Sequence, residues 1–189
     1  APTYRATLNL NGGGSLARYY VSVSYVDEGG MYKVDEGLKD YNTNANYRRW
    51  NYRLNVDMDI TKSTLLKVGV AGSLDKKNEP GMAGNIWASA MRNNPISVPV
   101  MYSNGYVPAY GSENDQLNPW VAATQTGYQE TWNNKLQANA TLEQSLNFIT
   151  KGLKFIGRYG FDTNNYQWIN RKKFPEMWRA EQNRASDGS

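Results

Sequence analysis

Apolar and polar residues alternate along six segments of this chain, with the period of two that indicates a β-strand with two different faces. The clearest segment is Tyr47–Ile60, in which Trp50, Leu54 and Met58 belong to the apolar set and charged or amide residues stand between them. These alternating segments predict an all-β fold. The six predicted strands are Tyr4–Asn11, Ala17–Val26, Tyr47–Ile60, Thr64–Asp75, Glu130–Leu146 and Leu153–Gln167.

Strand length and the chemistry of the two faces separate a membrane sheet from a soluble sandwich, in which residues also alternate. Most of the predicted strands reach the ~9–11 residues that cross a bilayer, whereas soluble strands average about 5–6. One face carries Arg, Asn, Asp and Lys, and the other is aliphatic in the middle with aromatic rings towards its ends. This arrangement suits a wet lumen on one side and lipid on the other. We therefore predict an antiparallel transmembrane β-barrel segment of about six long strands.

The connections between the predicted strands alternate between short and long. Outer-membrane barrels have short periplasmic turns and long extracellular loops, so we expect the long loops to lie outside the cell. Within the longer loop, Asn85–Arg92 predicts a short helix with Ile86, Trp87 and Ala90 available for packing, and Pro119 marks a turn. The three turns are Gly12–Ser15, Thr61–Ser63 and Asn147–Gly152, and the two loops are Asp27–Asn46 and Lys76–Gln129.

Six strands do not close a barrel, because the smallest common barrels have about eight. An open sheet would also leave unpaired backbone groups in lipid, which is not tolerated. We therefore expect residues 1–189 to be part of a barrel domain whose remaining strands belong to a longer protein.

Composition excludes several functions. The 14 Tyr and 6 Trp suit membrane interfaces or sugar-binding surfaces. A mean hydropathy of −0.72 suggests a soluble protein, but lipid-facing and lumen-facing residues cancel in such an average. The 21 Lys and Arg are scattered among 17 Asp and Glu, so a nucleic-acid partner is not indicated. Without His or Cys, Ser-His, Cys-His and His-based metal sites are excluded, so we predict no enzyme activity and no cofactor.

Several segments also carry sequence motifs. Arg18–Lys33 (RYYVSVSYVDEGGMYK) resembles the Tyr-Tyr-x-Ser-x-x-Tyr strand and acidic-glycine turn of SusC/RagA-type TonB-linked outer-membrane proteins. Tyr47–Lys62 (YRRWNYRLNVDMDITK) resembles the next strand of that family, with its Arg-aromatic-Asn-aromatic-Arg-x-Asn core. Ala88–Pro95 (ASAMRNNP), followed by Asn104-Gly105-Tyr106 and Asn118-Pro119, is similar to the long external loop, and Leu153–Asp162 to a later strand. These motifs span most of the chain, and they follow one another in the same order as in that family.

The resemblance implies a partial TonB-dependent receptor barrel of 22 strands in the outer membrane of a Gram-negative, Bacteroidetes-like cell. It also implies a plug domain, a contact with TonB through an N-terminal region, and a SusD-like surface lipoprotein as a lid. The cargo would be an oligosaccharide or a peptide. The plug and the TonB box are not among these 189 residues.

Two groups of residues are candidates for function. Rings and a cation in the long loop are candidates for contact with cargo or lipoprotein, with loop packing as the alternative; they are Trp87, Arg92, Tyr102, Tyr106, Tyr110 and Trp120. The residues predicted to face the lumen are Arg49, Arg53, Asp57 and Arg158. Asp57 and Asp59 share a strand face, and we expect them to pair with Arg49, Arg53 or Lys67 rather than to act as catalytic carboxylates.

Two other functions remain open at this stage. A soluble β-rich carbohydrate-binding module would also be rich in Tyr and Trp, and it would need no detergent. A passive porin or an adhesin barrel would share the strand pattern but would lack a plug.

Overall fold

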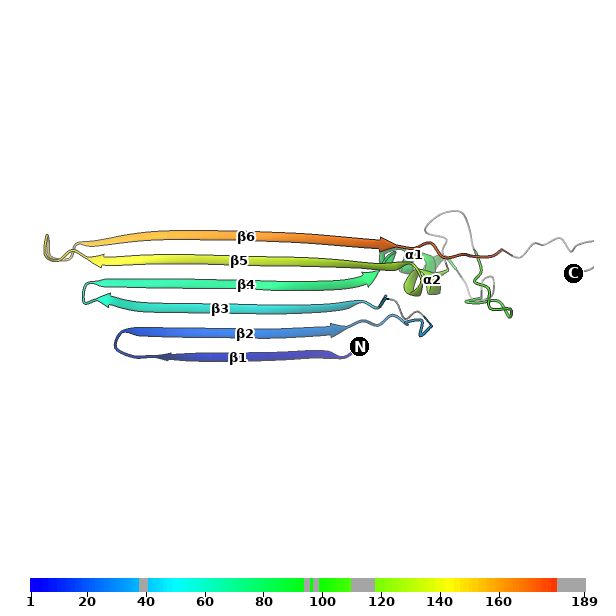
Figure 1. Cartoon of the computed structure of the whole chain (residues 1–189), viewed down its shortest axis with the longest axis horizontal. Coiled ribbons are helices and arrows are strands. Elements are labelled where there is room, and N and C mark those ends of the chain that lie inside the picture. Colours follow the sequence, from blue (N-terminus) through cyan, green and yellow to red (C-terminus); the bar gives the residue numbers. More distant parts are fainter. Residues whose placement is uncertain (38–40, 94–95, 97–98, 110–117, 180–189) are drawn as a thin grey trace, which may run out of the picture. The chain divides into compact units, whose positions relative to one another are not determined.

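The computed structural model describes residues 1–37, 41–93, 96, 99–109 and 118–179 of the chain. Its main feature is one six-stranded sheet in which each strand pairs with its neighbour in sequence, in the order β1-β2-β3-β4-β5-β6 (Figure 1). Successive strands run in opposite directions, so the prediction of an all-β antiparallel fold is confirmed. The strands are β1 Thr3–Gly13, β2 Ala17–Gly29, β3 Asn46–Thr61, β4 Thr64–Pro80, β5 Gly127–Ser145 and β6 Lys154–Lys172.

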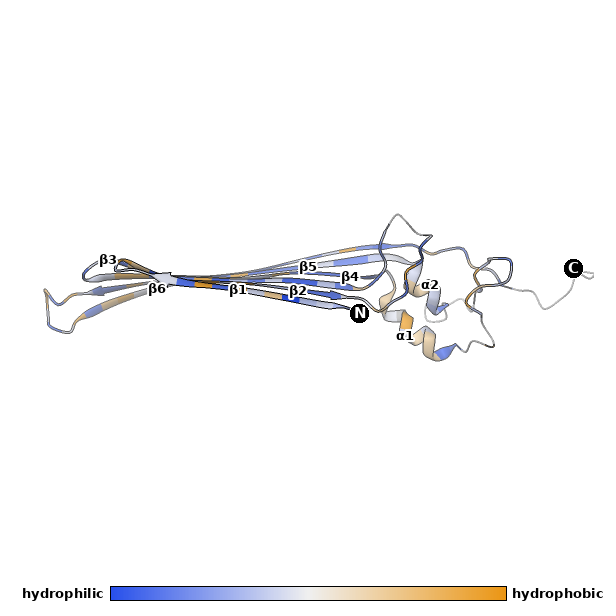
Figure 2. Ribbon diagram, turned by 90° about the horizontal axis from the view of Figure 1, so that it is seen from below, coloured by the Kyte–Doolittle hydropathy of each residue, from blue (hydrophilic) through white to orange (hydrophobic). Residues whose placement is uncertain are grey.

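Strand register separates the polar from the apolar residues, as the alternation predicted. Val21 of β2 lies opposite Leu10 of β1 and Leu54 of β3, whereas its neighbour Ser22 lies opposite Arg53. Because successive side chains of a strand point to opposite faces, β1, β2 and β3 share one apolar face and one polar face. The mixed colours along the ribbons reflect this alternation (Figure 2).

Strands β4 and β5 extend further than the sequence pattern indicated. The predicted boundaries were Asp75 and Glu130, but β4 continues to Pro80 and β5 begins at Gly127. The alternation fades there because polar residues replace apolar ones, yet a backbone ladder needs no particular side chain. The long loop is correspondingly shorter than the predicted range 76–129.

The chain divides into two compact units. Unit 1 comprises Ala1–Gly29, Asn46–Lys77 and Thr131–Trp168, and it contains only strands and the turns that join them. Within this unit no second layer packs on the sheet. Accordingly, every hydrophobic residue that is buried in the described chain lies in the other unit. Leu8 remains 72% exposed and Trp50 47% exposed.

Unit 2 comprises Gly30–Ala45, Asn78–Glu130 and Ile169–Ser189. Its described residues include two helices, α1 Ala83–Arg92 and α2 Pro119–Thr124. Helix α1 confirms the helix predicted in the long loop. The buried hydrophobic cluster of unit 2 is formed by Met82, Ile86, Ala122 and Ala123, and Tyr32 and Met177 pack against this cluster.

Helix α2 was not predicted, since Pro119 was interpreted as a turn. Proline is well tolerated at the first position of a helix, because its missing N–H would have no partner there. Asn118 caps the helix through its side-chain oxygen, which accepts a 3.0 Å hydrogen bond from the Trp120 backbone N–H. Among the described residues, no helix is long and apolar enough to cross a membrane.

Candidate functional site: a polar hollow on the sheet

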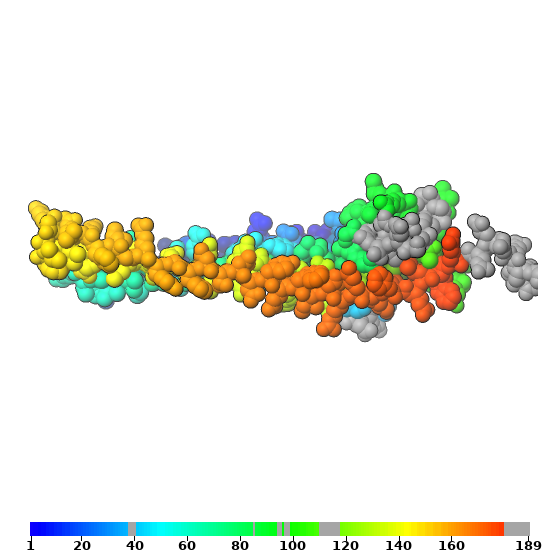
Figure 3. All heavy atoms as spheres, turned by 90° about the horizontal axis from the view of Figure 1, so that it is seen from above, coloured from blue at the N-terminus to red at the C-terminus, as the bar shows by residue number. Residues whose placement is uncertain are grey.

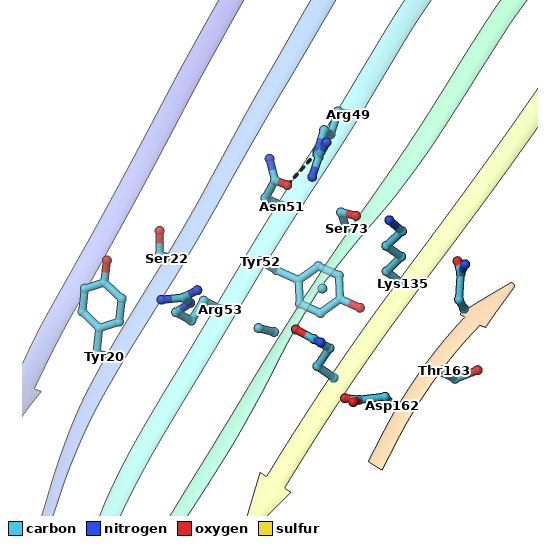
Figure 4. Close-up of a pocket in the computed structure, with 14 residues that line it drawn as sticks. Tyr20, Ser22, Arg49, Asn51, Tyr52, Arg53, Ser73, Lys135, Asp162 and Thr163 are labelled. Carbon is cyan, nitrogen blue, oxygen red and sulfur yellow. Dashed lines mark hydrogen bonds between the residues drawn. The ribbon is translucent and has the colours of Figure 1, made fainter. Parts of the chain in front are cut away.

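An open hollow of about 660 Å³ lies on the sheet of unit 1, and most of the residues that line it belong to the polar face (Figure 4). Its volume falls within the range of about 300–1,000 Å³ that small-molecule sites usually occupy. Five strands contribute to it. The lining residues are Tyr20, Ser22, Arg49, Asn51, Tyr52, Arg53, Ala71, Gly72, Ser73, Lys135, Gln137, Asp162, Thr163 and Asn164.

The register of β2 and β3 builds one side of the hollow. Arg53 lies opposite Ser22 and Asn55 lies opposite Tyr20, so a guanidinium, a hydroxyl and an aromatic ring come together. Figure 4 shows the Arg53 side chain extending over β2 towards Ser22. The Tyr20 hydroxyl donates a 3.3 Å hydrogen bond to Oδ1 of Asn9. This bond orients the ring along the polar face.

Arg49 is already engaged by its neighbours. Its Nε lies 3.4 Å from Oδ1 of Asp75 and donates a 2.8 Å hydrogen bond to Oδ1 of Asn51. The Asn51 amide in turn donates to the Ser24 hydroxyl at 3.1 Å. Together these contacts form a polar chain across β2, β3 and β4, in which the charge of Arg49 is balanced.

Two cations in the hollow have no such counter-charge. Arg53 and Lys135 make no ion pair within the described part of the chain, and the carboxylate that shares the hollow belongs to Asp162. The other ion pairs of the polar face join Arg18 to Asp59 and Lys67 to Glu143. The hollow therefore carries one more positive than negative charge beyond the Arg49–Asp75 pair.

The predicted pairing of Asp59 with Arg49, Arg53 or Lys67 was wrong, because Arg18 is its partner, whereas the charge of Asp57 does act on Lys67, one of the expected partners. Arg18 lies opposite Asp57 in the register and its Nη2 is 3.3 Å from Oδ2 of Asp59, while Lys67 binds Glu143 at 2.6 Å. Arg49 stands eight residues from Asp57 on the same strand, a separation of roughly 26 Å at the usual rise. The partner of Asp59 comes from β2, a neighbouring strand that the prediction had not considered.

The residues predicted to face the lumen are only partly brought together. Arg49 and Arg53 line the hollow, whereas Asp57 and Arg158 do not. Lys135, Asp162 and the hydroxyl and amide residues around them were not among the candidates. The alternation along the fifth and sixth predicted strands places Lys135, Gln137 and Asp162 on the polar face, but only pairing between strands shows that they meet.

The loop candidates lie in unit 2 and have different environments. Trp87 is 62% exposed on α1, so the prediction that it helps to pack the helix was wrong, while Ile86 is buried. The ring of Tyr106 stacks on Trp178 with centroids 4.7 Å apart. Trp178 was not predicted, because it is distant in the sequence from the loop.

The remaining loop candidates differ in exposure: Tyr102 and Trp120 are half-buried, and Arg92 is exposed. Tyr102 is half-buried, and its backbone N–H donates a 2.8 Å hydrogen bond to the Tyr106 carbonyl. Trp120 is half-buried on α2 and Arg92 is exposed in the last turn of α1. Tyr110 lies outside the described residues.

The side chains of the hollow are mainly charged and neutral hydrogen-bonding groups. Its side chains offer a guanidinium, an ammonium, hydroxyls and amides. Within the described residues, no three acidic, His or Cys side chains gather in a way that would hold a metal ion. No family model and no curated protein sequence matches this chain.

Proposed function

We propose that this chain forms part of the wall of an outer-membrane β-barrel that imports an oligosaccharide or a peptide by a TonB-dependent route. The observation that carries the proposal is the apolar face of unit 1, which has no second layer. Leu, Val, Tyr and Trp side chains line this face, and the opposite face is polar and hollowed. A soluble protein rarely exposes a large continuous apolar surface, because its contact with water is unfavourable.

Aromatic residues near the loop ends of the strands support a membrane position. The rings of Tyr25 and Trp50 lie 4.4 Å apart between their centroids, and Nζ of Lys76 lies 4.4 Å from the centre of the Trp132 ring. The Tyr25 hydroxyl also donates to the Asp27 carboxylate at 3.0 Å. Rings with polar or charged neighbours are typical of the interface between hydrocarbon and water.

The two edges of the sheet support a larger barrel. Within the described part of the chain, strands β1 and β6 each pair on one side only, and the atoms of β6 lie along one edge of the sheet (Figure 3). β6 has 19 residues, so its outer edge presents a long row of unpaired N–H and C=O groups. Only closure into a barrel satisfies such groups in lipid, and we propose that further strands of a longer protein pair with both edges.

The long loops are the proposed site of contact with partners. Trp87 projects from α1 and Tyr106 stacks on Trp178, which places rings where a lipoprotein or the cargo could bind. The resemblance to SusC/RagA-type proteins supports a SusD-like lipoprotein as the external partner and TonB as the source of energy.

Two neighbouring substitutions on β3 test the membrane position. Leu54 belongs to the apolar face, and Asn55, the next residue, belongs to the polar face opposite Tyr20. In the complete barrel protein, Leu54→Arg places a charge in hydrocarbon and should cost about 2–4 kcal/mol of folding free energy, whereas Asn55→Arg should cost less than about 1 kcal/mol. Urea titration of the protein in lipid vesicles measures both.

The matched pair makes the result decisive. Both variants add the same side chain to the same strand, and they differ in the face on which it lies. Equal and small losses for the two variants, or a protein recovered from the soluble fraction without detergent, would contradict the membrane position and favour the soluble carbohydrate-binding module.

A further inference from the structure

We propose that the polar hollow selects an anionic oligosaccharide, one that carries carboxylate groups, as the cargo that passes along this wall. This inference rests on the proposed function and adds the chemical class of the substrate. Its basis is the charge imbalance among the residues that line the hollow.

Arg53 and Lys135 supply the attraction for an anion. Neither forms an ion pair with any residue that the structure describes, and both side chains are open to solvent. They stand on β3 and β5, with β4 between them. A guanidinium binds a carboxylate with two parallel hydrogen bonds, and an ammonium adds a point charge. Rings of Arg and Lys similarly give anion pores their selectivity.

The neutral residues of the hollow indicate a polyhydroxylated ligand. Hydroxyl and amide side chains surround the two cations and can exchange hydrogen bonds with sugar hydroxyls; they are Ser22, Asn51, Ser73, Gln137, Thr163 and Asn164. Tyr20 is 38% exposed, and its ring offers a surface on which a sugar ring can stack. Ala71 and Gly72 are the only aliphatic positions, so a peptide with apolar side chains would find little to bind.

Asp162 refines this selectivity. Its carboxylate repels any acidic group of the ligand that binds next to it, but it accepts hydrogen bonds from sugar hydroxyls. A ligand with an acidic group on every sugar would therefore bind less well than one that carries them on some sugars only. We therefore expect the ligand's acidic groups to bind towards Arg53 and Lys135, with neutral hydroxyls towards Asp162.

The test uses the complete barrel protein, purified in detergent, and titration calorimetry with trigalacturonate and its neutral methyl ester. The acid should bind at least about tenfold more tightly than the ester, since each charge-assisted hydrogen bond contributes about that factor. The double variant Arg53→Gln/Lys135→Gln should abolish the difference. The double variant Arg5→Gln/Lys154→Gln, which loses the same charge from the polar strand faces outside the hollow, should keep it.

Several outcomes would overturn the inference. They are equal binding of the acid and its ester, a preference that survives Arg53→Gln/Lys135→Gln, and triglutamate that binds as tightly as trigalacturonate. The variant Arg53→Lys/Lys135→Arg keeps both charges and should retain most of the preference for the acid. It thus shows whether the Gln variant loses the preference through its lost charges or through a misfolded sheet.

The same preparation separates this inference from the proposed function. A protein that is extracted from the outer membrane and shifts its gel mobility on boiling, as folded barrels do, but does not prefer the acid contradicts the anionic cargo alone. A protein that remains folded in the soluble fraction contradicts both.

Discussion

At the scale of single residues, Gly72 is a position in the sheet where a side chain has no room. A Cβ atom there would collide with the backbone carbonyl of Lys135 and with the hydroxyl of Tyr52. In Figure 4 the Tyr52 ring reaches from β3 across β4 at this point. Register places Tyr52 opposite Val23 on the apolar face, so glycine allows the ring to lie flat against the sheet.

Gly72→Val should therefore destabilise the sheet. The added side chain displaces the Tyr52 ring and strains the pairing of β4 with β5, at a cost on the order of 1–3 kcal/mol. The fraction of protein that keeps the folded gel mobility during heating in detergent measures this loss. Gly14→Ala is the control, because no heavy atom of the described chain lies within 4 Å of its Cβ position; an equal loss in both variants would contradict the packing argument.

At the scale of elements, α2 shows how one side chain organises part of the long loop. Asn118 is 2% exposed, and its amide donates a 3.0 Å hydrogen bond to the Val100 carbonyl. Its oxygen caps the helix at the Trp120 N–H. The residue thus joins two parts of unit 2 that are 18 positions apart, and it leads into the buried residues Ala122 and Ala123.

Replacing Asn118 should loosen this loop without affecting the sheet. Asn118→Ala removes both hydrogen bonds and should cost about 0.5–2 kcal/mol of local stability through the lost cap. Asn118→Asp keeps the cap oxygen and loses only the amide donor, so its effect should be smaller. Limited proteolysis of the loop, followed by mass spectrometry, measures both rates. An Asp variant that is cleaved as fast as the Ala variant would mean that the cap is not the main stabilising contact.

The ion pairs of the strands are weaker contributors at this scale. Nζ of Lys67 lies 2.6 Å from Oε1 of Glu143, but both side chains are partly exposed, at 42% and 27%. Exposed pairs of this kind usually contribute less than about 1 kcal/mol. These ion pairs therefore position charged side chains on the polar face but contribute little to the stability of the sheet.

At the scale of the whole molecule, unit 1 lacks the hydrophobic core that would stabilise it in water. Its strands keep their ladders through backbone hydrogen bonds, while the apolar face and the edges β1 and β6 lack partners among the residues that the structure describes. The buried hydrophobic residues of unit 2 are few, and several of them are alanine or valine. Among the described residues, backbone ladders rather than a buried core hold the sheet of unit 1 together.

The 189-residue segment alone should accordingly associate in plain buffer. Exposed apolar surface and long unpaired strand edges both promote pairing between copies. Light scattering after size exclusion should give a mass well above 21.4 kDa without detergent. A monodisperse 21.4 kDa species with the strand content of this sheet would instead indicate a soluble module. Addition of lipid-like detergent should reduce the association.

Much of the fold could be predicted from local pattern. Trp50, Leu54 and Met58 alternate with polar residues along β3, and this period of two requires no knowledge of neighbouring strands. The ends of β4 and β5 could not be predicted in this way, because pairing continued where the alternation stopped. Helix α2 had a readable signal in Asn118 and Pro119, a cap residue followed by a proline suited to the first turn.

The candidate site was less predictable than the fold. The sequence placed Arg49, Arg53 and Asp57 on polar strand faces, but it did not show which charges would pair. Arg49 forms an ion pair with Asp75 on the next strand, and Asp57 lies opposite Arg18 in the register. Lys135 and Asp162 are site candidates only because pairing across β4, β5 and β6 places both of them at the same hollow.

The sequence by itself determined the strand faces, the alternation of short and long connections and the absence of thiol and imidazole chemistry. These properties depend on residue identity and on neighbours one or two positions away, where the period of a strand fixes the direction of each side chain. Only the tertiary structure decided the ion-pair partners, the hollow with its unbalanced Arg53 and Lys135, and the stacking of Tyr106 on Trp178. Each of these joins residues far apart in the chain, and the distances between them depend on how strands pair and loops pack, which a pattern of near neighbours along one strand does not show.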